Sequence, residues 1–170
     1  MERAQEICIE MLSQREYTEI KSGLDEITAR KPDKMPIVVY FANTDKFNVK
    51  DIQYYISDMQ NRNIRHTILI YKNLITPFTQ KATKQFPGFI FELVPMCDLQ
   101  YNITKHELQP EFSRLEQLEA KRFKKKYGTK FGLLRSNDPI SKFYGYKRGD
   151  VIKIDRRKFT RGGITYRLVI

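Results

Sequence analysis

The sequence contains few cysteines and no long apolar segment. Cys8 and Cys97 are its two cysteines, and alone they supply neither a disulfide framework nor a zinc site, which fits a reducing compartment. No apolar run reaches the roughly 18 residues of a membrane span. Glu2, Glu6 and Glu10 stand where a signal peptide would need a basic start and an apolar stretch. We expect a soluble intracellular protein without a membrane partner.

Common catalytic motifs are also missing. The sequence has no glycine-rich phosphate loop ending in Gly-Lys and no Gly-x-Ser-x-Gly elbow. His106-Glu107 begins like a zinc-protease motif, but Pro110 occupies the position of its second histidine. We therefore expect no metal site.

A nuclease-like arrangement is incomplete as well. Pro32-Asp33 matches the first half of one nuclease motif. Its second half ends in a lysine two positions after an acidic residue, and neither Asp51 nor Glu92 has that lysine. The carboxylates and lysine that hold a metal ion and orient a water molecule are thus not assembled. We expect a protein without catalytic activity or cofactor, and a degenerate nuclease is the weakest alternative.

The basic excess is large and uneven. The 170 residues carry a net charge of +11, and 41% of them are hydrophobic, which indicates a globular protein rather than a disordered polycation. Residues 1–93 contain 13 basic and 12 acidic side chains, whereas residues 94–170 contain 18 and 8, so the two parts have net charges of +1 and +10. This difference in net charge suggests two units, the second of which faces nucleic acid or an acidic protein surface.

One basic cluster lies within residues 121–126. The helix expected there has acidic residues near its start and Gly128 just past its end. The helix dipole and a glycine C-cap favour this arrangement, so a solvated helix end explains the cluster, and a phosphate contact is the alternative. The cluster consists of Lys121, Arg122, Lys124, Lys125 and Lys126.

Hydrophobic periodicity predicts a small, mostly parallel α/β domain over residues 1–94. It combines helices with short apolar strands in a strand-helix-strand unit followed by a third strand. The expected helices are 2–15, 49–59 and 78–85, and the expected strands are 37–41, 67–71 and 89–93.

The periodicity breaks near Pro95, where the charge step also falls, so we expect a linker at 95–100. A small α+β domain is expected to follow over residues 101–170. Its predicted strands are 101–104, 151–155 and 164–169, and its predicted helices are 115–127 and 139–144.

Two turns carry residues suited to recognition. Thr76 can cap a helix in which Pro77 occupies the first position. The free amides at such a helix start favour phosphate, and Lys81 follows nearby in the sequence. Phe78 or Pro77 can lie against a DNA groove, although an ordinary capped helix explains the motif equally well. We predict a DNA-proximal surface of Thr76, Pro77, Phe78 and Lys81.

The second turn region begins with Asp138-Pro139, which again predicts a capped helix start. Further along, Gly149 is expected to supply the positive φ of a turn that presents Lys147 and Arg148 just before a strand. A rigid pair of cations suits recognition of a carboxylate or phosphate.

Short motifs in a fixed order cover nearly all of residues 101–170. They are Asn102-Ile103-Thr104, His106-Glu107-Leu108 with Pro110, Asp138-Pro139, Tyr144-Gly145 with Lys147-Arg148-Gly149, Val151 with Lys153-Ile154, and Ile164-Thr165-Tyr166-Arg167. The series resembles the fifth, shared subunit of the eukaryotic nuclear RNA polymerases, whose C-terminal domain is similar to the corresponding subunit of archaeal RNA polymerase. Weaker similarity extends upstream through Arg3-Ala4 and Ile75-Thr76-Pro77.

The resemblance implies a non-catalytic nuclear subunit of RNA polymerases I, II and III. In that family an N-terminal jaw domain lies near downstream duplex DNA, without sequence specificity, and a C-terminal assembly domain is anchored on the largest subunit. The implied partners are therefore the largest and other polymerase subunits and DNA, with no homo-oligomer. The positions carried over to the assembly interface are His106, Glu107, Asp138, Pro139, Lys147, Arg148 and Arg167.

The sequence departs from the family in three places. Phe78 and Thr79 replace small residues of the DNA-side loop, and Phe112 replaces a histidine. The stretch between the first helix and the first strand is short, which implies a trimmed jaw.

The alternative is a free-standing basic nucleic-acid-binding protein, in which the +10 half stacks single strands on exposed aromatic residues. We expect most of these residues to lie in the core. The aromatic residues available are Tyr101, Phe123, Tyr127, Phe131, Phe143, Tyr144, Tyr146, Phe159 and Tyr166.

Overall fold

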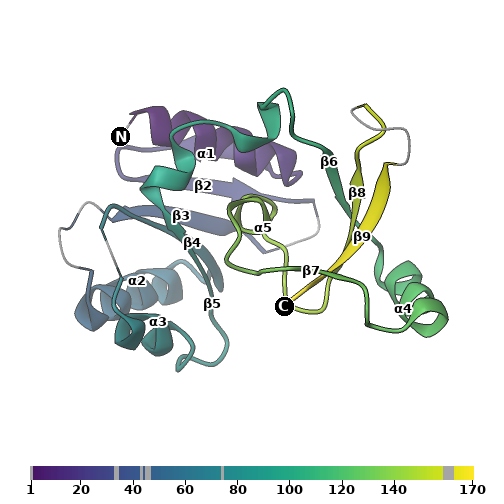
Figure 1. Ribbon diagram of the computed structural model, residues 1–170. Helices are drawn as coiled ribbons and strands as arrows, with labels where there is room; N and C mark the ends of the chain where they lie inside the picture. Colours follow the sequence, from purple (N-terminus) through teal and green to yellow (C-terminus); the bar gives the residue numbers. More distant parts are fainter. Residues whose placement is uncertain (1, 33–34, 43, 45–46, 74, 159–162) are drawn as a thin grey trace. The chain divides into compact units, whose positions relative to one another are not determined.

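Two separate β-sheets organise the chain, each within its own unit. The computed structural model describes residues 2–32, 35–42, 44, 47–73, 75–158 and 163–170, so Asp33 and Phe159 lie outside the described residues. The first unit is Met1–Tyr101 and the second is Asn102–Ile170 (Figure 1). No helix in the described part of the chain combines the length and apolar character needed to cross a membrane.

A five-stranded sheet with the order β1-β2-β3-β4-β5 forms the first unit. Strands β1 (Thr18–Ser22), β2 (Glu26–Arg30) and β3 (Ile37–Ala42) are antiparallel neighbours, whereas β3, β4 (His66–Tyr71) and β5 (Ile90–Pro95) run parallel. Every residue of β3 is buried, which explains its continuous apolar run.

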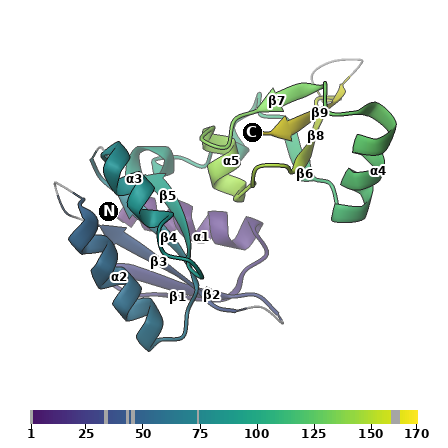
Figure 2. The ribbon, with the colours of Figure 1, turned by 90° about the horizontal axis from the view of Figure 1, so that it is seen from below.

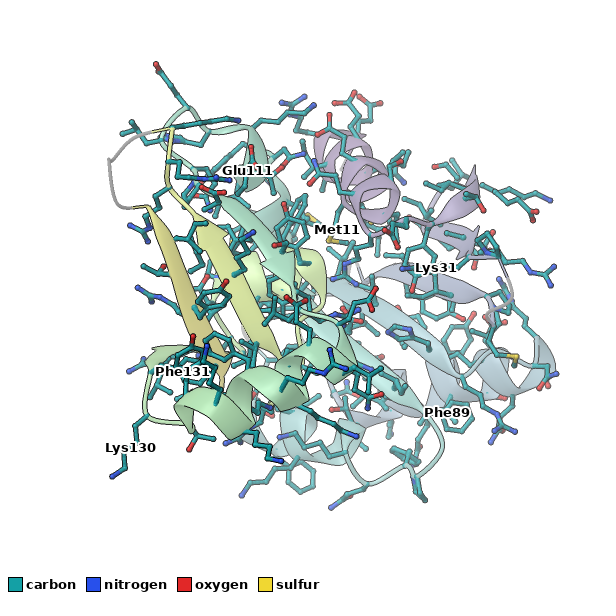
Figure 3. The ribbon with its side chains drawn as sticks, turned by 90° about the vertical axis from the view of Figure 1, so that its right-hand side faces the viewer. Met11, Lys31, Phe89, Glu111, Lys130 and Phe131 are labelled. Atoms are coloured by element: carbon teal, nitrogen blue, oxygen red, sulfur yellow. The ribbon has the colours of Figure 1, made fainter. Side chains whose placement is uncertain are left out.

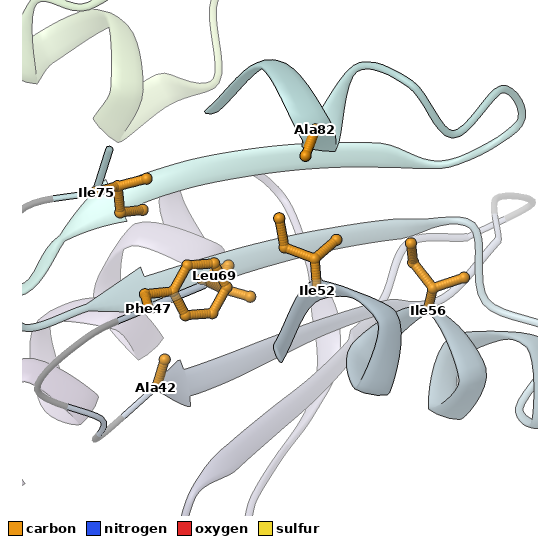
Figure 4. Packing of buried hydrophobic residues seen from close by; sticks show 7 residues of the cluster. All are labelled: Ala42, Phe47, Ile52, Ile56, Leu69, Ile75 and Ala82. Atoms are coloured by element: carbon orange, nitrogen blue, oxygen red, sulfur yellow. The ribbon is translucent and has the colours of Figure 1, made fainter. Parts of the chain in front are cut away.

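Helices cover both faces of this sheet (Figure 2). Helix α1 (Glu2–Gln14) lies on one face, and α2 (Val49–Asn61) and α3 (Pro77–Thr83) lie on the other. The α2–α3 side is filled by side chains from both helices, the neighbouring strands and the loops between them (Figure 4). The buried members of this cluster are Ala42, Phe47, Ile52, Ile56, Leu69, Ile75 and Ala82.

The parallel strand-helix-strand unit is confirmed, but the sheet is mixed rather than mostly parallel. The polar stretch after α1 forms the hairpin β1–β2, which adds two antiparallel strands. Strand β1 is exposed on nearly all its residues, and β2 buries only Ile27 and Ala29. Hydrophobic alternation is therefore too weak to identify these strands.

The second unit contains a four-stranded sheet with the order β6-β8-β9-β7. Strands β6 (Glu111–Arg114), β8 (Val151–Asp155) and β9 (Ile164–Val169) are antiparallel neighbours, and β7 (Gly132–Leu134) runs parallel to β9. The second unit also contains the helices α4 (Gln117–Tyr127) and α5 (Pro139–Tyr144). Its core consists of Leu134, Ile140, Tyr146, Ile152, Ile154 and Val169.

Two expectations about the middle of the chain are wrong. Residues 95–100, expected to be a linker, contain the 3-10 helix η1 (Met96–Leu99), which packs on α1 and buries Leu99, so they belong to the first unit. Residues 101–104, expected to be a strand, include the start of the 3-10 helix η2 (Ile103–Lys105). The Asn102 side chain accepts from the Thr104 amide at 3.0 Å and so stabilises a turn instead.

Candidate docking and DNA-facing surfaces

The predicted DNA-side residues share the outer surface of α3. Thr76 Oγ1 accepts from the Thr79 amide at 3.2 Å, and Pro77 occupies the first helical position. Thr79 is buried, so the inner side of the helix is fixed in the core. Phe78, at 72% exposure, and Lys81 are exposed together with Thr76 and Pro77. The expected cap is confirmed, and the four side chains lie within about two helical turns of one another.

The two carboxylates weighed for a nuclease have structural partners. The Asp51 side chain accepts from the Asn48 amide at 2.8 Å, while the Asn48 side chain accepts from the amide of Asp51, so the pair forms a capping box at the start of α2. Among the described residues, no three histidine, cysteine, aspartate or glutamate side chains are grouped to hold a metal ion.

Glu92 on β5 forms a largely buried ion network with Arg15, which directly follows α1, and with His66 on β4, and no local sequence pattern predicts this network. Its Oε2 lies 2.8 Å from Arg15 Nη1, and its Oε1 lies 2.7 Å from His66 Nε2. Burial opposes ionisation of Glu92, but the Arg15 charge and the His66 hydrogen bond outweigh it and lower its pKa to about 2. Glu92 therefore acts as a structural anion.

In the second unit, His106 and Glu107 line a polar groove of about 510 Å³ beside the edge strand β6. His106 Nδ1 accepts from the Leu108 amide at 3.2 Å, which orients the ring. Glu107 is exposed, and Phe112 and Lys153 also line the groove. The side chain of Phe112 also packs against the core.

Asp138 and Pro139 begin α5 as expected. Asp138 Oδ1 accepts from the Ile140 amide at 2.9 Å, and Pro139 occupies the first position of the helix. Gly145 ends α5 in the left-handed conformation. Because Ile140 is buried in the core, this cap fixes the start of α5 against the sheet.

The turn from Lys147 to Asp150 is closed by two hydrogen bonds. The Lys147 amide donates to Asp150 Oδ2 at 2.8 Å, and the Asp150 amide donates to the Lys147 carbonyl at 3.0 Å. Gly149 has φ +92°, which confirms the expected glycine turn. Lys147 and Arg148 are both exposed on it.

Arg167 lies on β9, apart in sequence from the other predicted docking residues. Its Nη1 donates to the Leu133 carbonyl of the β7 segment at 3.2 Å. The seven predicted docking residues thus stand on four segments of the second unit: the loop before β6, the start of α5, the turn before β8, and β9.

Comparisons with known proteins give one family match and several similar proteins. Residues 101–169 match the family model described as "RNA polymerase Rpb5, C-terminal domain". The Dictyostelium discoideum "DNA-directed RNA polymerases I, II, and III subunit rpabc1" is 31% identical over 95% of this chain and 93% of that protein. The chain belongs to the RPABC1 family.

Other members of the RPABC1 family are similarly related. The Caenorhabditis elegans "DNA-directed RNA polymerases I, II, and III subunit RPABC1" is 31% identical over 88% of this chain and 74% of that protein. The Arabidopsis thaliana "DNA-directed RNA polymerase V subunit 5C" is 32% identical over 85% of this chain and 64% of that protein. The family model spans almost all of the second unit, and the similarity to whole relatives also includes most of the first.

Proposed function

We propose that this protein is a non-catalytic structural subunit of nuclear DNA-directed RNA polymerase. The second unit anchors it on the largest subunit, and the first forms part of the jaw near downstream DNA. The observation that carries the proposal is the family match over residues 101–169, which coincides with one complete structural unit. Catalysis belongs to other subunits of the complex.

Docking through the second unit is supported by the chemistry of its exposed loops. Lys147 and Arg148 project from a closed turn, so little backbone freedom is lost when they pair with carboxylates of a partner. The groove at His106 and Glu107 offers hydrogen-bonding groups beside the edge strand β6. A partner rich in acidic side chains fits the net charge of +10 over residues 94–170.

The contacts of the first unit with DNA are weaker than the docking contacts of the second unit. The α3 surface presents one exposed aromatic ring and one lysine, and residues 1–93 have a net charge of only +1. Its attraction to DNA is therefore independent of sequence, sensitive to salt and dependent on the polymerase to hold it near the duplex. The isolated first unit binds duplex DNA poorly for the same reason.

Affinity purification of the tagged full chain from its native cells at high salt tests the assembly role. We expect stoichiometric recovery with the large polymerase subunits. The double variant Lys147→Glu and Arg148→Glu is expected to lose most of these companions. Lys121→Glu with Lys125→Glu makes the same charge change on the exposed helix α4 and serves as the matched control.

The outcomes separate the proposal from its main alternative. Recovery with nucleic acid and without polymerase subunits would support a free-standing nucleic-acid-binding protein and contradict assembly. Equal loss of companions in both double variants would show that general charge, rather than the turn before β8, holds the chain on the enzyme.

A further inference from the structure

Helix α4 lies on the surface of the second unit. None of its 11 residues is buried, and Leu118 is 70% exposed. An isolated helix of this length is marginally stable in water, so its contacts with the rest of the unit matter. The aromatic side chains on one side of the helix provide such contacts.

Four aromatic rings gather where α4 meets β9. The Phe123 ring centroid lies 4.5 Å from that of Tyr166 on β9, 4.8 Å from Tyr127 and 5.3 Å from Phe131. Together they line a shallow hollow of about 600 Å³, and Tyr127 is 57% exposed. Figure 3 shows Phe131 beside α4 and β9. An exposed aromatic hollow of this kind is typical of a binding surface.

Cations surround the hollow. Lys126 Nζ lies 5.0 Å from the centroid of the Tyr127 ring, Lys130 extends outward beside Phe131 (Figure 3), and Arg156 lines the hollow itself. Arg167 lines it as well, and residues 120–137 contain no acidic side chain. The surface therefore attracts a ligand with several negative charges.

The hollow also adjoins an incomplete strand edge. β9 pairs with β8 along Ile164–Leu168, but β7 pairs only with Arg167–Val169. Among the described strands, Ile164–Tyr166 therefore has a neighbour on one side alone. An open edge of this kind can accept one more strand from another polypeptide, because its backbone donors and acceptors are directed outward.

We propose that the hollow between α4 and β9 binds an extended acidic segment of a protein partner, which adds as a strand to Ile164–Tyr166. Acidic side chains of the segment pair with Lys126, Lys130 and Arg156, and an apolar side chain enters the aromatic hollow. This site adjoins the proposed largest-subunit interface, because Arg167, one of the predicted docking residues, also lines the hollow. The proposal does not depend on the polymerase assignment.

Single-stranded nucleic acid is the competing ligand. A stacking platform presents ring faces to successive bases, whereas the Phe123 ring here packs against three neighbouring rings. The open backbone edge can form strand hydrogen bonds with another polypeptide, which a nucleic acid does not offer. Both observations favour a peptide.

A labelled peptide tests the proposal with the full chain. The probe is a 12-residue peptide in which glutamate alternates with valine around one central phenylalanine, and binding is followed by fluorescence anisotropy. We expect saturable binding that weakens at least tenfold in the double variant Lys126→Glu and Lys130→Glu and severalfold in Tyr127→Ala. The matched control is Lys121→Glu with Lys125→Glu, because these two side chains lie on the opposite side of α4 from Phe123.

Four further measurements, with a glutamine peptide, a proline peptide, hydrogen exchange and oligo(dT), decide between the interpretations. A peptide with glutamine in place of glutamate, and one with proline at two central positions, are both expected to bind at least tenfold more weakly. Hydrogen exchange of backbone amides in residues 164–166 should slow when the acidic peptide binds. Equal binding of the proline peptide, equal weakening by the control variant, or tighter binding of oligo(dT) than of the peptide would each overturn the proposal.

Discussion

The two units of this chain differ in how completely they bury their own apolar surface. Eleven of the twelve largest fully buried side chains among the described residues belong to the first unit, and Ile152 alone represents the second. Strand β3 is buried throughout, whereas α4 has no buried residue. The first unit therefore has the larger fully buried core, while the second leaves α4 without a buried residue; both units expose some large hydrophobic side chains, among them Phe78 and Leu118.

The charges show the same contrast. In the first unit, Arg62 pairs with Glu26 at 2.8 Å and with Asp58 at 3.0 Å, and Arg15 pairs with Glu92. In the second unit, Lys147 and Arg148 are exposed and seven basic side chains of residues 120–137 have no acidic neighbour in that stretch. Ion pairs also occur in the second unit, such as Arg157 with Asp155 and Lys158 with Glu111, but the net charge of +10 over residues 94–170 leaves an excess that favours an acidic partner.

Leu69→Ala should show the largest effect of any single change considered. Leu69 is fully buried in the α2–α3 cluster, so its truncation is expected to lower the free energy of unfolding by about 3 to 4 kcal/mol. Urea unfolding measures this change. Leu118→Ala on α4 is the matched truncation in the second unit and should change stability by less than about 0.5 kcal/mol. A similar loss of stability in both variants would contradict the difference in packing between the two units.

Glu92→Gln should lower the free energy of unfolding by about 2 to 3 kcal/mol, because it leaves the nearly buried Arg15 guanidinium without its carboxylate. Glu6→Gln is the control, since the Arg3–Glu6 pair is exposed and should contribute less than about 0.5 kcal/mol. Equal effects in the two variants, measured by urea unfolding, would contradict the structural role of Glu92.

Glu92 should also make the free energy of unfolding sensitive to acid. The pKa of Glu92 in the folded protein is about 2, below its ordinary value of about 4.3 in an unfolded chain. The stabilisation is therefore fully present above about pH 4.3 and is lost as the pH falls toward 2. We expect a loss of roughly 2 kcal/mol between pH 5 and pH 2.5, and a flatter profile for Glu92→Gln.

Ser141→Ala should have the smallest effect and the opposite sign. Ser141 Oγ is buried in α5 with no hydrogen-bond partner among the described residues, so removing it should raise the free energy of unfolding by about 0.5 to 1 kcal/mol. Thermal or urea unfolding checks the change. Destabilisation by this variant would show that the hydroxyl has a partner in solution.

The elements with strong periodicity were predictable from the sequence, and the weakly patterned ones were not. The apolar spacing in α1 and α2 and the continuous apolar runs of β3 and β4 identify these elements directly. The strands β1, β6 and β7 bury few or none of their residues, so tertiary pairing rather than local pattern determines them.

The candidate sites follow the same rule. Local turn chemistry predicts the caps at Thr76 and Asp138 and the positive φ of Gly149, since each depends on neighbours in sequence. The Arg15–Glu92–His66 network and the meeting of Phe123 with Tyr166 join residues more than 25 positions apart. Such contacts require knowledge of which elements are neighbours in space.

Hydrogen exchange on the full chain, alone and within the purified polymerase, tests the central contrast most directly. We expect that assembly slows exchange mainly in residues 102–170, at the turn before β8, at the loop before β6 and along the strand edges. Protection confined to residues 1–101, with the second unit unchanged, would contradict the assignment of the second unit as the docking module.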